Sequence, residues 1–138
     1  MNWLVWSLLS ASFAAMTAIL AKLGVTGIDA NLATAIRTTV ILIFTWMIVL
    51  FTGVSGIGQI PGRSWLWLVL SGTATGLSWL CYFQALRVGE ASRVAPIDKL
   101  SVVLVIVFAA FFLGERITGP KALGVLLMAA GAIVIAAK

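Results

Sequence analysis

The chain has 138 residues, of which 62% are hydrophobic and only 9% are charged, far below the roughly 25% charged residues of a soluble globular domain, so that class is excluded. Histidine is absent and Cys81 is the only cysteine, which excludes a His/Cys metal site, a disulfide framework and a Ser-His-Asp triad within one chain. The net charge of +5 comes from basic residues scattered singly along the sequence, a pattern that does not indicate nucleic-acid binding.

Five apolar stretches dominate the sequence, each with the length of about 20 residues that a helix needs to cross a hydrocarbon core of ~30 Å. The predicted spans are residues 3–23, 32–52, 65–86, 94–113 and 120–137. The first stretch has no basic region before it and no clear cleavage signal after it, so we expect a membrane span rather than a signal peptide. We therefore predict one all-α integral membrane domain over residues 1–138.

The connections between the spans are short. The turn after the first span contains Asp29 and Asn31, and either side chain could cap the second helix. The longest connection, residues 53–64, is rich in glycine and contains Pro61, as expected of a loop. None of the connections is long enough to hold a soluble catalytic domain.

An odd number of spans puts the two termini on opposite sides of the membrane. If the N-terminus is inside, the cytoplasmic basic residues are Arg63, Arg116 and Lys121; if it is outside, they are Lys22, Arg87, Arg93 and Lys138. The positive-inside rule hardly distinguishes these two orientations. Such a weak bias is expected of a protein that inserts in both orientations, and also of a singly oriented protein with an unclear signal.

Apart from Lys22 and Lys121 at the ends of their spans, three charged residues fall inside predicted spans, namely Arg37, Asp98 and Lys99. Each costs at least ~2.5–3.5 kcal/mol at a helix centre and is a candidate functional residue. In one interpretation Asp98 pairs with Arg37 or Lys99, and the remaining cation reaches the membrane surface. In the other, the two cations face a water-filled cavity and attract a negative group of a substrate, with Asp98 as their counter-ion or as a proton-coupling carboxylate.

Polar side chains line one face of the third span. Ser71, Thr75, Ser78 and Tyr82 follow helical spacing. Such residues either line a pathway for a solute or hold helices together. With Trp79 beside this stripe and Thr38 beside Arg37, the candidate substrate-binding and coupling residues are Arg37, Thr38, Ser78, Trp79, Tyr82, Asp98 and Lys99. In the last span, Gly124 and Gly131 suggest a helix-pairing surface that could form a dimer contact.

Segments of the second half of the chain resemble a known family. They are Ala-Leu-Arg-Val-Gly-Glu-Ala-Ser at 85–92, Val-Ala-Pro-Ile-Asp-Lys-Leu-Ser-Val-Val at 94–103 and Phe-Leu-Gly-Glu-Arg at 112–116. They are similar to the EamA domain of the drug/metabolite transporter superfamily. The resemblance covers essentially the whole chain as one five-helix unit. It implies one half of a ten-helix inverted-repeat transporter fold, completed here by a second copy of the chain in a homodimer that is antiparallel by analogy.

The resemblance and the charges lead to one functional expectation. We expect a secondary transporter of a small polar or amphipathic metabolite, working by alternating access as a multi-pass protein of the plasma or inner membrane. Its partners would be the substrate, the lipid bilayer and a second copy. We expect no nucleic acid, no cofactor, no metal and no enzymatic activity, and the absence of a P-loop argues against ATP hydrolysis. The alternative is a non-transporting membrane subunit or chaperone for another membrane protein.

Overall fold

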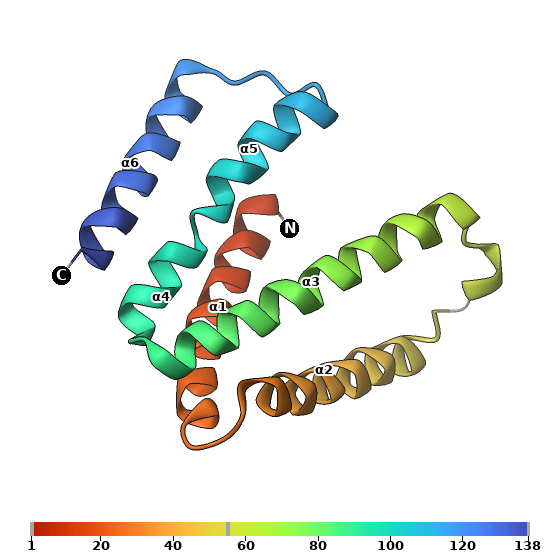
Figure 1. Cartoon of the computed structure of the whole chain (residues 1–138). Helices are drawn as coiled ribbons and strands as arrows, with labels where there is room; N and C mark the ends of the chain where they lie inside the picture. Colours follow the sequence, from red (N-terminus) through yellow and green to blue (C-terminus); the bar gives the residue numbers. More distant parts are fainter. Residues whose placement is uncertain (1, 55, 138) are drawn as a thin grey trace. The chain divides into compact units, whose positions relative to one another are not determined.

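The computed structural model describes residues 2–54 and 56–137, and the regular secondary structure in these ranges is helical, without a β-strand. Its elements are α1 (Trp3–Val25), α2 (Ala30–Thr52), the short 3₁₀ helix η1 (Ile57–Gln59), α3 (Gly62–Val88), α4 (Ala91–Asp98), α5 (Ser101–Phe112) and α6 (Gly119–Ala136) (Figure 1). With α4 and α5 taken together as residues 91–112, five segments are long and apolar enough to cross a membrane. The predicted all-α membrane fold is confirmed.

The chain divides into two compact units. One contains Leu20–Arg87, which covers the end of α1, all of α2, the loop after α2 and α3 up to its last residue but one. The other contains the described residues up to Ile19 together with those from Val88 onward, which include α4, α5 and α6. Each unit is described by itself.

In the unit Leu20–Arg87, the buried residues gather where α1 ends, α2 begins and α3 ends. Val25, Ala30 and Leu86 are almost fully buried there. Lys22 Nζ donates a hydrogen bond of 2.6 Å to the carbonyl oxygen of Leu86, which satisfies one of the carbonyl groups that a helix leaves open at its C-terminus. Small residues and a satisfied carbonyl therefore hold three helix ends together.

Helix α2 has a defined start and stop. The Asp29 carboxylate accepts hydrogen bonds from the backbone N–H groups of Asn31 (2.9 Å) and Leu32 (3.2 Å), so Asp29, rather than Asn31, is the N-cap. The same carboxylate lies 3.7 Å from the Arg87 guanidinium at the end of α3. At the other end, Gly53 ends the helix with φ of 65°, a left-handed conformation that glycine adopts without steric cost.

The sequence predicts a single fourth span, but in the structure this span consists of two helices. Helix α4 ends at Asp98 and α5 begins at Ser101. Pro96 has no N–H group, so it leaves the helical hydrogen bond to the preceding turn unmade. Beyond it, the N–H groups of Leu100 and Val102 each bond a carbonyl three residues back at 3.0 Å, which tightens the chain locally in the manner of a 3₁₀ turn.

Helix α6 uses one face for contacts within its own unit and leaves another open. It packs against α4 and, less extensively, α5. Its less exposed residues recur at helical spacing: Ala122, Val125, Ala129, Ala132 and Ala136. Gly124 and Gly131 lie outside this series, and a Cβ added at either would meet no neighbouring atom within 4 Å. The glycine face of α6 is therefore uncovered.

The cap at Asp29 gives a stability prediction. We expect Asp29→Ala to lower the free energy of unfolding by about 1 kcal/mol, because two backbone N–H groups lose their acceptor. Asp29→Asn keeps a capping oxygen and removes only the ion pair with Arg87, whose two side chains are about half exposed. That pair contributes ~0–1 kcal/mol, so we expect Asn to be the milder change. Unfolding in mixed detergent micelles, followed by circular dichroism, measures both. An equal loss in the two variants would show that the charge, and not the cap, stabilises this helix end.

Candidate functional site

Arg37 is the charged residue that the structure surrounds most specifically. It is the eighth residue of α2, about 10 Å along the helix axis from the first. Its Cζ atom lies over the Trp79 ring at 4.2 Å from the centroid and 5.6 Å from the centroid of Phe83. Both distances are within the range of cation–π attraction, which is stronger where water is excluded. The aromatic rings of α3 therefore support a guanidinium inside a membrane span.

The sequence explains why these side chains meet. Trp79 and Phe83 are four residues apart and so lie on one face of α3. The first turns of α2 bury Ala30, Ala33 and Thr34, small residues of the kind that let membrane helices approach closely. Arg37 follows this stretch by one turn, where the longer side chain reaches the rings of α3.

The Arg37 guanidinium has no carboxylate partner among the described residues of its own unit. Among the described residues of Leu20–Arg87, no carboxylate lies within ion-pair distance of this guanidinium, and no hydrogen bond from it is found. Cation–π contact uses the face of the guanidinium, whereas its N–H donors point outward in its plane in a fixed fork. That fork matches a carboxylate or phosphate group. The arrangement is suited to binding an anion.

The other predicted residues of this unit differ in their surroundings. The Thr38 hydroxyl donates to the carbonyl oxygen of Thr34 at 2.8 Å, a bond within its own helix. Ser78 is exposed, whereas Trp79 and Tyr82 are half-buried. The Tyr82 ring packs edge-on against Phe83, with centroids 6.5 Å apart. Arg37, Trp79 and Tyr82 thus share Phe83 as a common neighbour.

Asp98 and Lys99 lie in the other unit, at the step between α4 and α5. Asp98 Oδ2 is 3.3 Å from Lys99 Nζ. Of the two partners considered for Asp98 from the sequence, Lys99 is the one found beside it. The Asp98 side chain is partly covered and that of Lys99 is more exposed. The two opposite charges adjacent in sequence partly neutralise each other within the span.

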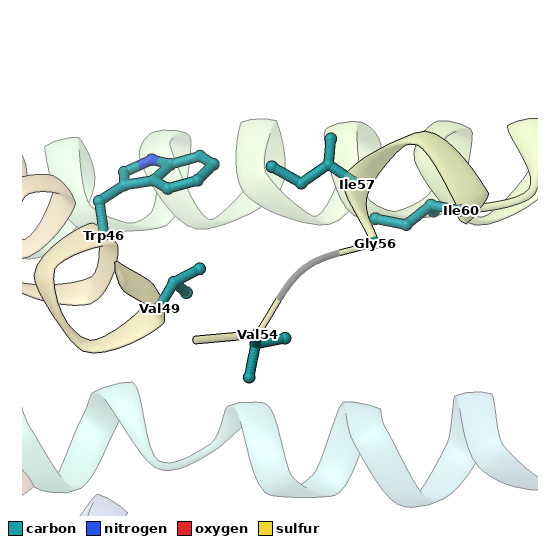
Figure 2. Close-up of a pocket in the computed structure, with 6 residues that line it drawn as sticks. All are labelled: Trp46, Val49, Val54, Gly56, Ile57 and Ile60. Carbon is teal, nitrogen blue, oxygen red and sulfur yellow. The ribbon is translucent and has the colours of Figure 1, made fainter. Parts of the chain in front are cut away.

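A separate hollow of about 310 Å³ lies where α2 ends (Figure 2). Its lining residues are Trp46, Val49, Val54, Gly56, Ile57 and Ile60. In Figure 2 the Trp46 indole extends toward Ile57 of η1. The described lining residues are apolar or glycine, a lining better suited to an apolar group than to a polar solute. It is therefore distinct in chemistry from the surroundings of Arg37.

Sequence reasoning missed two features. It did not select Phe83, although its spacing from Trp79 carries the necessary signal. It did not find the hollow, which depends on how the loop after α2 folds back. For metals, no group of three or more His, Cys, Asp or Glu side chains in the described part of the chain is arranged to hold an ion.

Comparisons with known proteins agree with this architecture. The family model described as the EamA-like transporter family matches residues 1–137. A curated relative from Sinorhizobium sp., named "Uncharacterized transporter in cobO 3'region", is 54% identical over 136 residues, which cover 98% of this chain and 96% of the relative. No solved structure matches the chain. The extent of the family match and the identity to this relative show that the chain belongs to the EamA-like transporter family.

Proposed function

We propose that this membrane transporter is a secondary carrier of a small polar or amphipathic metabolite, which works by alternating access in an antiparallel homodimer. The proposed substrate-binding and coupling residues are Arg37, Thr38, Ser78, Trp79, Tyr82, Asp98 and Lys99. The observation that carries the proposal is the guanidinium of Arg37, which lies over Trp79 inside a membrane span with no carboxylate beside it in its unit. A charge in that environment is costly unless it meets a partner, and a transported solute is such a partner.

The proposed roles follow from the chemistry of each group. The Arg37 fork binds a negative group of the solute, and the Trp79 and Tyr82 rings form an apolar wall beside it. The hydroxyls of Thr38 and Ser78 supply weaker polar contacts. Asp98 and Lys99, held 3.3 Å apart, set the local charge in the fourth span.

Arg37 and Asp98 occupy corresponding positions within their own spans. Arg37 is the eighth residue of α2, and Asp98 is the eighth residue of the span that begins with α4. Each helix therefore carries its charge about 10 Å from its start. Discontinuous helices near the middle of the membrane are a recurring feature of transporter binding sites, and the step after Asp98 is of this kind.

Three observations support an antiparallel pair. The relative from Sinorhizobium sp. is only slightly longer than the 136 aligned residues, which cover 96% of it. The basic residues of the loops give almost no preference for one orientation. The Gly124 and Gly131 face of α6 is uncovered and is of the kind that pairs helices. Two units inserted in opposite orientations would reproduce the inverted repeats common in transporters.

The first prediction concerns Arg37. We expect Arg37→Ala to raise the solute concentration needed for half-maximal flux about 10- to 100-fold, because a hydrogen-bonded charge contributes ~1.5–3 kcal/mol. Proteoliposomes loaded with a defined mixture of amino acids, organic acids and nucleosides would be assayed for efflux by mass spectrometry. The solutes released by the unmodified protein would then be measured singly with the variant.

Arg116→Ala is the matched control, because it removes a basic side chain from an exposed loop. We expect it to leave flux unchanged. Size-exclusion chromatography and circular dichroism would verify that Arg37→Ala remains folded. Normal transport of every released solute by Arg37→Ala would contradict the proposed role of Arg37. If the unmodified protein releases no solute of the mixture but binds another membrane protein, the transporter proposal is contradicted and the subunit interpretation gains support.

The second prediction concerns Asp98. Asp98 Oδ2 lies 3.3 Å from Lys99 Nζ, so we expect Asp98 to act as a counter-ion. Asp98→Asn should then lower flux by a similar factor at every pH without changing the shape of the pH profile. Efflux from proteoliposomes between pH 5 and pH 9 measures this. Loss of pH dependence in the variant would instead assign proton coupling to Asp98.

A further inference from the structure

The hollow at the end of α2 lies at the boundary of a predicted membrane span. Trp46 and Val49 come six and three residues before the end of α2 at Thr52, about 9 and 4.5 Å along the axis. The remaining lining residues belong to the loop and η1. The hollow therefore extends from the hydrocarbon side of the helix end to the level at which the chain leaves the membrane.

The described loop residues that line the hollow are apolar or glycine. Val54 and Ile57 are 67% and 51% exposed. Two glycines with positive φ, Gly53 at 65° and Gly56 at 142°, permit backbone turns that other residues rarely adopt. The turned loop presents aliphatic side chains that gain free energy when an apolar ligand covers them.

A positive charge follows this apolar surface directly. Arg63 is the second residue of α3 and comes three residues after Ile60, so its backbone lies within ~10 Å of the hollow's edge. Its side chain is exposed, and no ion pair with it is found among the described residues of Leu20–Arg87. The first turn of α3 adds the positive end of a helix dipole at the same place.

We propose that the hollow and Arg63 together bind one anionic phospholipid of the bilayer, with part of an acyl chain in the hollow and the headgroup phosphate at Arg63. The adjacency of an apolar cavity and a cation matches the two ends of such a lipid. The described residues that line the hollow of about 310 Å³ carry aliphatic side chains and one indole, and a hydrocarbon chain matches these in polarity.

Fluorescence of Trp46 gives a direct test. A variant retaining Trp46 alone, with Trp3, Trp6, Trp65, Trp67 and Trp79 replaced by Phe, would be reconstituted in phosphatidylcholine bilayers. Phosphatidylglycerol with brominated acyl chains, which quenches nearby tryptophan, would be added at a low mole fraction. We expect it to quench Trp46 at about fivefold lower mole fraction than brominated phosphatidylcholine, the factor expected for one basic side chain near an anionic lipid.

Variants of Arg63 separate the proposed site from general contact with the bilayer. We expect Arg63→Gln to abolish the preference for phosphatidylglycerol and Arg63→Lys to retain most of it. Arg116→Gln, which neutralises another exposed loop arginine, should leave the preference unchanged. Equal quenching by the two lipids, or a preference that survives Arg63→Gln, would overturn the proposal.

A second measurement uses the protein with all its tryptophans. Native mass spectrometry of the unmodified chain, released from micelles containing equal amounts of phosphatidylglycerol and phosphatidylcholine, should show one retained phosphatidylglycerol. The Arg63→Gln variant should lose it. Inorganic phosphate added in excess should not displace it, because phosphate has no acyl chain. Displacement by phosphate, or retention of both lipids alike, would contradict binding in the hollow.

Discussion

The guanidinium of Arg37 must be supported inside a medium that offers it almost no hydrogen-bond partner. The chain supports the face of this cation with Trp79 and Phe83, since an aromatic ring attracts a cation without neutralising it. A carboxylate in the same position would satisfy the charge and close the binding edge. The aromatic support leaves the charge in place while its N–H fork stays open, which is the property that a binding site for an anion requires.

This support depends on how the helix ends of the unit are joined. Ala30, Ala33 and Thr34 in the first turns of α2 and Leu86 near the end of α3 are buried, and Asp29, the N-cap of α2, lies 3.7 Å from Arg87 of α3. Lys22 and Asp29 satisfy the backbone groups at that end, through the Leu86 carbonyl and the first N–H groups of α2. A bilayer strongly penalises unsatisfied backbone groups, so these contacts define where the helices converge. The site of Arg37 is positioned by this convergence.

Much of the fold was predictable because span length and charge depletion follow directly from the thickness of the membrane. The pairing of Asp98 with Lys99 was also among the predicted alternatives. Other features depend on geometry that composition does not encode. The break between α4 and α5 results from backbone hydrogen bonds that reach three residues back, rather than four, beyond Pro96. The hydrophobicity of the span does not show at which residue this change begins. The contact of Arg37 with Phe83 requires the relative rotation of two helices, and the hollow near Trp46 requires the path of a glycine-containing loop.

The orientation of the chain in the membrane decides whether an antiparallel homodimer can form. Single cysteines would be introduced as Gln59→Cys and, separately, Thr118→Cys in a Cys81→Ala background, in loops that follow the second and fourth spans. Labelling of intact cells with an impermeant thiol reagent, before and after permeabilisation, measures the fraction of each site that faces outward. An antiparallel homodimer predicts that about half of each site labels from outside. Labelling of both sites from one side only would contradict it, and the transporter would then need an oppositely oriented partner protein.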